Sequence, residues 1–296
     1  MNVISLFDGM SCGQIALNEL GISPALYYAS EIDQHAIKQT KLNFPNTIHL
    51  GDVTKWKEWN IDWASIDLVL AGSPCQGFSF AGKQLAFDDP RSKLFFVFVE
   101  ILNHIKKHNP NVRFLLENVN MKKEYLRVIS EYVGVFPVNI NSNLVSAQNR
   151  ERWYWTNIKT KEIGLFNETY SDINQPEDKG VKLNDIIENG FYSDVEKSYC
   201  IDANYKKGSN FRRYFFCGSR QIVFQNGYTP SKMTKNTANE IMHKEGKKFR
   251  ILTANECAKL QTIPDWYKWE CSDTQIYRMC GNGWTVEVIK WILSFL

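Results

Sequence analysis

A potential nucleophile follows one of the apolar runs of the sequence. Cys75 lies in Gly72-Ser73-Pro74-Cys75-Gln76, directly after the run at 66–72. Pro74 restricts the backbone just before the thiol. A cysteine at the end of a buried strand can attack an electrophilic carbon, although a lone cysteine is more often a structural one. The groups that the fold brings to Cys75 therefore decide between the two interpretations.

A carboxyl group and two guanidinium groups follow later in the chain. Glu117 lies near the end of the apolar run 113–119, and Arg150 and Arg152 occupy alternate positions of Gln148-Asn149-Arg150-Glu151-Arg152. Alternate residues of a strand share one face, so we expect both arginines on one side of a late strand. A thiol, a carboxyl group and two guanidinium groups at one sheet edge favour a catalytic site. For Arg152, a surface ion pair remains the alternative.

The first loop of the chain has the composition of a ligand-binding turn. Phe7-Asp8-Gly9-Met10-Ser11-Cys12-Gly13 joins an apolar run to a helical pattern, and its small residues allow a ligand to approach the backbone. A plain tight turn would have the same composition. Glu31, after the second apolar run, can accept hydrogen bonds from both hydroxyls of a ribose. Asp52, after the third, lies where the base would be, so together these groups favour a nucleoside site.

Elements of alternating type must position these groups. Short apolar runs alternate with helical patterns, such as the spacing of Leu94, Phe98, Ile101, Leu102 and Ile105. This alternation predicts an α/β fold with a doubly wound, mostly parallel sheet. The predicted strands are 2–7, 25–30, 48–50, 66–72, 113–119 and 152–158, and the predicted helices are 35–43, 94–108 and 123–133. From about 160 the pattern becomes loop-like, until a helical pattern with a Thr253/Glu256 capping box returns at Arg250.

Composition excludes several classes of protein. The chain has 296 residues, 44% hydrophobic and 23% charged, with no apolar run long enough to cross a membrane. Its first residues lack the basic region of a secretory signal. The seven cysteines include no CxxC pair and no zinc-type spacing with histidine, so neither a disulfide framework nor a metal site is expected. We expect a cytoplasmic protein without membrane association.

Positive charge is concentrated in one segment. Residues 197–250 contain twelve lysines and arginines against three acids, a net charge of +9, whereas the whole chain carries +3. The remainder therefore sums to −6. This asymmetry indicates a surface for a polyanion, although a solvated face would look alike.

These motifs resemble those of the DNA (cytosine-5) methyltransferase family. FDGMSCG, GSPCQGFSFAGK, LLENV, QNRER, RILTANECAKLQTIPDWY and GNGWTVEVIK match in order and roughly in spacing. The match covers 1–158 and 250–296, and the compact bacterial or phage enzymes are the most similar. The chain departs from many bacterial members at Asp8, where they have alanine, and at Ser11-Cys12, where they have two glycines.

The resemblance implies a Rossmann-like, S-adenosylmethionine-dependent fold and a role for each catalytic group. The Cys75 thiolate would add to C6 of a flipped-out cytosine, whose C5 then takes the methyl group. Glu117 would hold or protonate N3, and Arg150 and Arg152 would stabilise charge on the O2 side. The product of the cofactor would be S-adenosylhomocysteine.

The resemblance also implies binding residues. The expected cofactor residues are Phe7, Asp8, Gly9, Met10, Ser11, Cys12, Glu31, Ile32, Asp52, Val53, Gly72, Pro74, Leu94, Asn282 and Trp284. The expected DNA-binding residues are Gln76, Ser79, Arg212, Arg213 and Arg220. Arginine side chains in the basic segment would bind phosphates and read base edges.

We also expect two domains and a nucleic-acid partner, with other functions as alternatives. Residues 1–158 would form the catalytic domain, completed by 250–296, and 159–249 the target-recognition region. We expect a monomer that acts on double-stranded DNA, with a separately encoded restriction endonuclease as a further partner. A tRNA cytosine-5 methyltransferase of the same fold and a non-catalytic DNA-binding module are the alternatives. A nicotinamide dehydrogenase would need G-x-G-x-x-G, which Gly9-x-x-x-Gly13 does not supply.

Overall fold

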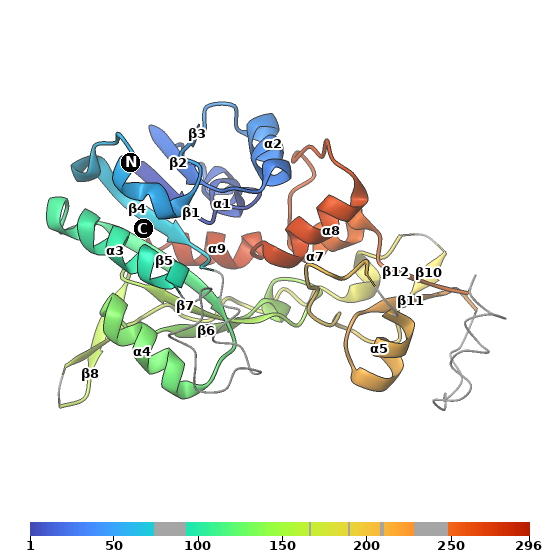
Figure 1. Cartoon of the computed structure of the whole chain (residues 1–296). Helices are drawn as coiled ribbons and strands as arrows, with labels where there is room; N and C mark the ends of the chain where they lie inside the picture. The colour runs from blue at the N-terminus through green and yellow to red at the C-terminus, as the bar shows by residue number, and fades with distance from the viewer. Residues whose placement is uncertain (74–92, 166, 189, 208–209, 228–247) are drawn as a thin grey trace. The chain divides into compact units, whose positions relative to one another are not determined.

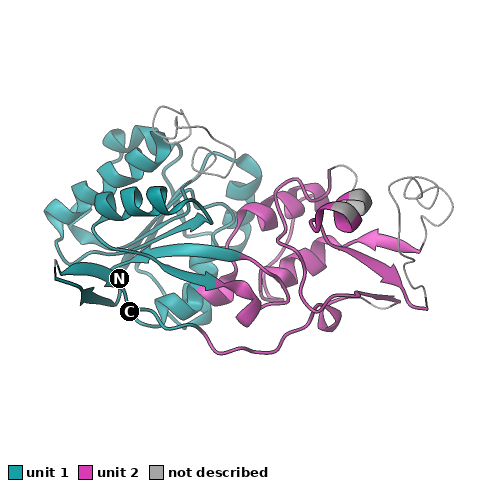
Figure 2. Ribbon diagram, turned by 90° about the horizontal axis from the view of Figure 1, so that it is seen from below, with its two compact units in different colours: residues 1–140, 151–175, 289–296 teal, residues 141–150, 176–288 magenta. Residues whose placement is uncertain are grey.

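The computed structural model describes residues 1–73, 93–165, 167–188, 190–207, 210–227 and 248–296. These residues form two compact units, shown in different colours in Figure 2. The larger unit comprises residues 1–140, 151–175 and 289–296, and the smaller unit 141–150 and 176–288. Figure 1 labels their helices and strands.

A seven-stranded sheet organises the larger unit, in the order β3-β2-β1-β4-β5-β7-β6. Its first five strands run parallel to their neighbours and β7 runs antiparallel to β5, which confirms the predicted α/β, mostly parallel fold. The strands are β1 (Asn2–Leu6), β2 (Leu26–Ser30), β3 (Ile48–His49), β4 (Ile66–Ala71), β5 (Arg113–Val119), β6 (Val138–Asn141) and β7 (Glu151–Thr156).

Helices connect and cover these strands. They are α1 (Cys12–Glu19), α2 (Gln34–Asn43), α3 (Lys93–His108) and α4 (Lys123–Val133), with the short 3-10 helices η1 (Val53–Glu58) and η2 (Trp63–Ser65). Apolar residues of α3 and α4 pack with those of β1, β4 and β5 in one buried cluster. A hairpin of β8 (Thr160–Ile163) and β9 (Glu168–Ser171) and the end of α9 (Val286–Leu293) complete this unit.

The direction of the chain through the sheet reverses beside β1. From β1 the chain proceeds to β2 and β3 on one side, and β4 then pairs with the opposite side of β1. In open α/β sheets ligands bind outside the carboxyl ends of the strands at such a switch point. The predicted cofactor loop follows β1, and Gly72-Ser73, which precede Cys75, follow β4. The topology therefore places the predicted cofactor loop and the Gly72-Ser73 segment at the switch point.

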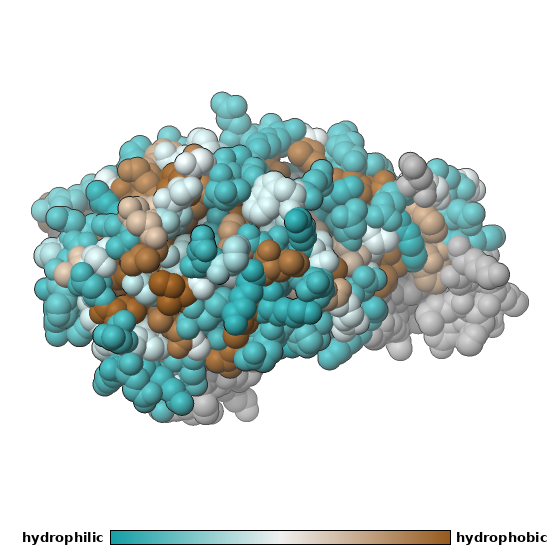
Figure 3. Space-filling model, turned by 90° about the horizontal axis from the view of Figure 1, so that it is seen from above, coloured by the Kyte–Doolittle hydropathy of each residue, from teal (hydrophilic) through white to brown (hydrophobic). Residues whose placement is uncertain are grey.

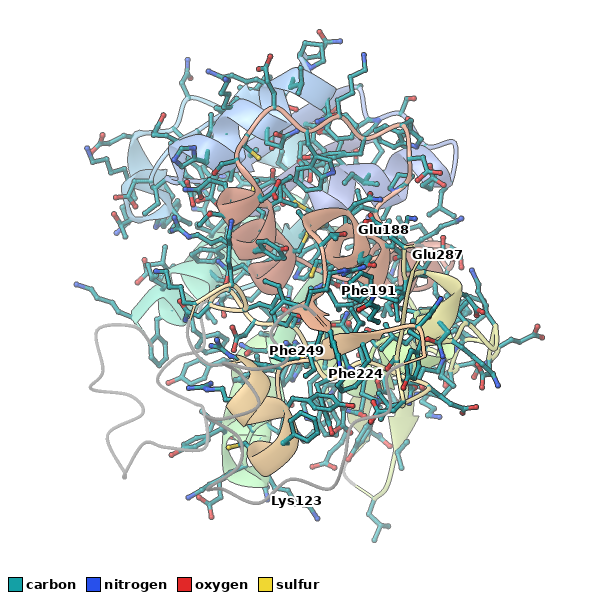
Figure 4. All side chains as sticks on the ribbon, turned by 90° about the vertical axis from the view of Figure 1, so that its right-hand side faces the viewer. Lys123, Glu188, Phe191, Phe224, Phe249 and Glu287 are labelled. Atoms are coloured by element: carbon teal, nitrogen blue, oxygen red, sulfur yellow. The ribbon has the colours of Figure 1, made fainter. Side chains whose placement is uncertain are left out.

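The smaller unit has its own sheet and core. Its sheet consists of β10 (Phe191–Tyr192), β11 (Ile222–Gln225) and β12 (Phe249–Ile251), with α5 (Asn210–Cys217) packed against β11. Figure 4 labels one phenylalanine on each strand, Phe191, Phe224 and Phe249. The unit also contains α7 (Ala254–Leu260), α8 (Asp273–Asn282) and the 3-10 helices η3 (Ser142–Leu144) and η4 (Leu183–Asp185). The capping box of Thr253 and Glu256 begins α7, as the sequence predicts.

The two compact units differ in bounds from the predicted domains. Residues 250–288 belong to the smaller unit, and 159–175 to the larger one. The functional division at 158 and 250 therefore stays a prediction. Arg250 was predicted in a helix and lies in β12, because the helix begins only after the Thr253 cap.

The surface is mostly polar. On the face that Figure 3 shows, hydrophilic residues predominate and apolar side chains occur in small groups. Across the described residues, none of the helices is both long enough and apolar enough to cross a bilayer.

Candidate active site

Glu117 and Arg152 form an ion pair near the carboxyl end of β5 in the large sheet. In the antiparallel pairing of β5 with β7, Glu117 lies opposite Tyr154 and Val119 lies opposite Arg152. Glu117 and Arg152 are therefore diagonal neighbours on one face. The Arg152 Nε lies 2.9 Å from the Glu117 Oε1, and the two side chains are only 14% and 12% exposed. Two of the predicted catalytic groups are thus brought together, in a position that holds the carboxylate in one orientation.

The loop after β1 has an unusual backbone. Phe7, Gly9 and Ser11 have φ angles of 60°, 59° and 67°. Residues other than glycine rarely adopt this left-handed backbone conformation, so other contacts must hold Phe7 and Ser11 in it. The loop leads directly into α1, whose first N–H groups have no partner within the helix. Such a loop offers main-chain donors to a ligand.

Glu31 provides part of this support. Its Oε2 accepts a hydrogen bond from the Gly9 N–H at 2.8 Å, and its Oε1 accepts from the N–H groups of Ile32 and Asp33, each at 2.8 Å. Glu31 thus joins the loop after β1 to the turn after β2. Oε1 is satisfied by two donors, whereas Oε2 accepts only one and retains acceptor capacity for a hydroxyl group of a ribose. Beside it, Ile32 is 69% exposed, which leaves an apolar surface open next to the carboxylate.

Asp8 provides the other part of the support for the loop after β1. Its Oδ2 accepts from the Ser11 hydroxyl at 2.6 Å and its Oδ1 accepts from the Tyr27 hydroxyl at 3.0 Å. Burial raises the pKa of Asp8 to about 6, and the nearby charge of Glu31 adds to the rise, whereas the hydroxyl hydrogen bonds oppose it. Burial and the negative charge of Asp8 also raise the pKa of Tyr27 well above its usual value. The carboxyl group therefore acts inside the loop and holds its shape.

Asp52 lies after β3, as predicted. Its Oδ1 accepts from the main-chain N–H and the hydroxyl of Thr54, both at 2.9 Å, and so caps η1. These two hydrogen bonds lower the pKa of Asp52. An ionised acceptor at this position suits the amino group of a base.

The remaining predicted cofactor residues of the larger unit lie near the same edge. Phe7 and Leu94 are half-buried and pack against the hydrophobic core. Met10, Ser11, Cys12 and Val53 are buried, whereas Gly72 is partly exposed. Pro74, Cys75, Gln76 and Ser79 lie outside the described residues.

Besides the DNA-binding arginines, three predicted site residues belong to the smaller unit. Arg150 precedes β7, so the alternation of that strand does not extend to it. Its side chain is buried, and its guanidinium group donates to main-chain carbonyls of Ile201, Gly281 and Gly283. Asn282 is exposed and Trp284 is buried.

The predicted DNA-binding arginines differ in their surroundings. Arg213, on α5, is exposed. Arg220 is buried; its guanidinium group donates to the Lys207 carbonyl and lies 3.3 Å from a carboxylate oxygen of Asp202. The backbone of Arg212 lies in α5, but its side chain lies outside the described part of the structure.

Sequence reasoning missed Tyr27. A tyrosine in a buried strand needs a partner for its hydroxyl group, and that rule could have connected β2 to a polar group nearby. The partner, Asp8, is nineteen residues away in the chain and meets Tyr27 because β1 and β2 pair in parallel.

The fold and the site together define a class. A ligand loop at a switch point and a carboxylate after the second strand are features of an α/β enzyme with a nucleoside cofactor, and a buried Glu–Arg pair lies near the carboxyl end of β5. The family model for C-5 cytosine-specific DNA methylase matches residues 1–295. The chain belongs to this family and is a DNA (cytosine-5) methyltransferase, so its fold and family imply S-adenosylmethionine as the methyl donor.

Individual proteins of known class are similar to the chain in sequence or in fold. The chain is 31% identical to the type II methyltransferase M1.ScrFI of Lactococcus lactis subsp. cremoris, over 97% of this chain and 75% of the relative. It is 31% identical to the type II methyltransferase M.HpaII of Haemophilus parainfluenzae, over 97% of this chain and 86% of the relative. The crystal structure of S. pombe Dnmt2 methyltransferase superposes with a TM-score of 0.64 at 20% identity, over 99% of this chain and 97% of that one.

Proposed function

We propose that the chain methylates cytosine in a specific duplex DNA site through a covalent adduct on Cys75. The observation that carries this proposal is the Glu117–Arg152 pair at the carboxyl end of β5, next to β4 in the sheet. Cys75 follows β4 in the sequence, so the carboxyl ends of two adjacent parallel strands lead to the nucleophile and to the acid.

The cofactor residues are proposed on three supports. The loop after β1 offers main-chain donors, Glu31 Oε2 offers an acceptor for a ribose hydroxyl, and Asp52 offers an ionised acceptor for the base. The open apolar side chain of Ile32 suits a base or ribose face. These residues fit an adenosyl group, and S-adenosylmethionine bound there would supply an electrophilic methyl group. Asn282 and Trp284 are proposed cofactor residues from sequence resemblance alone.

The proposed reaction begins at the cytosine ring. The Cys75 thiolate bonds to C6, while Glu117 holds or protonates N3 and thereby accepts the electron density that the addition releases. Arg152 orients Glu117 and stabilises charge on the O2 side. The activated C5 then takes the methyl group. Loss of the C5 proton to water or hydroxide and elimination of the thiolate restore the aromatic ring.

The target must leave the duplex for this chemistry, because C5 and C6 lie within the base stack. We propose that the basic segment 197–250 binds the flanking phosphates, with Arg213 among its exposed groups. We also propose that the enzyme works as a monomer, and that it has a separately encoded endonuclease as a partner; the similarity to type II methyltransferases supports the second point.

A trapping experiment tests the adduct. Sequencing of methylated cytosines in plasmid DNA from expressing cells first identifies the site. An oligonucleotide with 5-fluorocytosine at that position should then crosslink covalently to Cys75, because the fluorine cannot leave as the C5 proton does. Cys75→Ala should abolish the crosslink and methylation, whereas the exposed Cys217→Ala should retain both. A crosslink on another residue, or turnover without any crosslink, would contradict the proposal. Faster methylation of tRNA than of duplex DNA would favour the RNA alternative.

A further inference from the structure

Gln148 connects three distant segments of the smaller unit. Its side chain is fully buried. Its Oε1 accepts from the Ile201 N–H at 3.0 Å, and its Nε2 donates to the Leu260 carbonyl at the end of α7 at 3.2 Å. The main chain beside it pairs with Ser198. The Gln148 amide thus joins the main chain at 201 to the main chain at the end of α7.

Arg150 extends this connection to a further segment. Its side chain is 3% exposed. Nη1 donates to the Ile201 carbonyl at 3.1 Å and approaches the Cys200 Sγ at 3.4 Å, and Nη2 donates to the carbonyls of Gly281 and Gly283 at 3.2 and 2.8 Å. One guanidinium group therefore bridges the chain at 200–201 and the segment 281–283, where α8 ends and the turn to α9 begins.

The geometry of the turn makes this contact specific. A Cβ built on Gly281 would lie 2.2 Å from the carbonyl carbon of Asp202 and 2.3 Å from the nitrogen of Ala203. Only glycine allows the two backbones to approach this closely. On its other side the turn is held by Gln261, whose Nε2 donates to the Cys280 carbonyl at 2.6 Å and whose Oε1 accepts from the Thr285 hydroxyl at 2.8 Å.

The partners of Arg150 are unlike those of a charge-stabilising group. Among the described residues, no carboxylate lies within ion-pair distance of its guanidinium group. Both terminal nitrogens donate to main-chain oxygens instead. A lysine ammonium is a single point of charge and cannot span two pairs of acceptors as the planar guanidinium does.

We propose that Arg150 is a positioning residue, which holds the end of α8 at Gly281–Gly283 against the chain at 200–203 and thereby places Asn282 and Trp284. The QNRER motif then has two functions: Gln148 and Arg150 organise the smaller unit, and Arg152 serves Glu117. The link to the cofactor rests on the proposed function, because it requires Asn282 and Trp284 to contact S-adenosylmethionine.

Two variants test the role of Arg150 from opposite sides of the contact. Arg150→Lys removes the planar guanidinium group but keeps the positive charge. Gly281→Ala separates the backbone at 281 from that at 202–203 without changing a charge. Amide hydrogen exchange of residues 281–285 should become faster in both. The Kd for S-adenosylhomocysteine, measured by calorimetry without DNA, and the KM for S-adenosylmethionine should rise about tenfold, the effect of about one charged hydrogen bond. Methyl transfer in a single turnover at saturating cofactor should stay within about threefold of the wild-type rate.

Arg152→Lys is the contrasting variant. It should lower the single-turnover rate about a hundredfold and leave the cofactor Kd unchanged, because Arg152 pairs with Glu117. The same pattern in Arg150→Lys, with unchanged exchange at 281–285, would overturn the proposal. Loss of folded protein in both Arg150→Lys and Gly281→Ala would also overturn it, since the effect would then not be local.

The experiment separates this proposal from the assignment of the cofactor residues. Faster exchange at 281–285 with an unchanged Kd would support the positioning role and contradict cofactor contacts by Asn282 and Trp284. Failure of the Cys75 crosslink would contradict the proposed chemistry without affecting the exchange result.

Discussion

At the scale of single residues, the carboxyl groups of this site differ in what they contact. Glu117 contacts a guanidinium group, Glu31 contacts main-chain N–H groups, and Asp8 contacts two hydroxyl groups. We therefore propose separate functions for the three acids: chemistry for Glu117, ligand binding for Glu31 and loop shape for Asp8. The first two functions were predicted from the sequence. The third was not, because Asp8 is surrounded by Ser11 and Tyr27 only once β1 and β2 have paired.

Asp8 should make stability depend on pH. Its pKa is raised from 3.8 to about 6, so the folded protein binds more protons than the unfolded chain between these values. Stability therefore falls as the pH rises through this window, by at most about 3 kcal/mol for a shift of this size. Asp8→Asn keeps the shape of the side chain without its charge. Its free energy of unfolding, from urea titrations between pH 4 and 8, should increase relative to wild type as the pH rises to about 7.

The matched control for Asp8 is Glu58→Gln, which neutralises an exposed carboxylate on η1. Its difference from wild type should stay nearly constant over the same pH range. Parallel curves for Asp8→Asn and wild type would show that the carboxyl group of Asp8 titrates as an ordinary surface acid.

Glu117→Gln should reduce methyl transfer strongly. The variant retains a hydrogen-bonding group beside Arg152 but loses the carboxyl group that holds or protonates N3. General acid catalysis contributes about 10²- to 10⁴-fold, and we expect a loss of that size in the single-turnover rate. Binding of DNA, measured by fluorescence anisotropy, should change little. Glu151→Gln alters the exposed neighbouring acid and should keep the wild-type rate; equal losses in both variants would refute a specific role for Glu117.

At the scale of elements, the regular patterns were predicted well. The strand at 113–119 and the helix at 123–133 have the predicted bounds, and the helix at 94–108 begins one residue earlier than predicted. Buried strands and one-sided helices leave a clear period in the sequence. The hairpin of β8 and β9 and the helices α5 and α8 were not predicted. Aromatic residues such as Tyr214 and Phe215 are weak helix formers, and their packing against β11 supports α5 as a helix.

The contacts between elements were harder to predict than the elements. Arg150 binds carbonyls that lie 51, 131 and 133 residues away, and a local pattern contains no information about them. The period-2 pattern therefore predicted a strand face for Arg150, although its side chain belongs to the smaller unit. Arg152 was predicted at the same sheet edge as Glu117, and the pairing of β5 with β7 brings the two side chains together.

The start of α7 depends on a buried ion pair as well as on its cap. The Thr253 hydroxyl accepts from the Glu256 N–H at 3.1 Å, and Arg250 donates to both carboxylate oxygens of Glu256 at 2.7 and 2.8 Å. Burial raises the pKa of Glu256, but the hydrogen bonds from Arg250 and main-chain N–H groups outweigh it and lower the pKa. Thr253→Ala should cost about 1 kcal/mol of stability in urea titrations. Glu256→Gln should cost about 3 kcal/mol or more, because Arg250 loses its counter-charge. Equal costs would indicate that only the cap matters.

At the scale of the whole molecule, charge is divided between structural and binding functions. The segment 197–250 contains twelve basic residues, and in its described part at least three of them are committed to contacts within the fold. Lys197 donates to the carbonyls of Asn143, Ser146 and Val181, Arg220 pairs with Asp202, and Arg250 pairs with Glu256. These contacts set an upper limit of nine on the cations of the segment that can bind a polyanion. The sequence identified the excess charge, but it could not show which cations had internal partners.

The salt dependence of DNA binding follows from this division. Each phosphate contact contributes about −0.9 to the slope of log K against log salt concentration, so nine contacts limit the slope to about −8. Arg213→Gln removes an exposed cation and should weaken the slope by about one. Arg220→Gln removes a buried one, so it should lower stability and leave the slope nearly unchanged. Anisotropy titrations of a labelled duplex between 50 and 300 mM salt measure both variants. A flat response in the wild type would show that this segment does not bind phosphates, and a smaller slope in Arg220→Gln would show that the Asp202 pair opens on DNA.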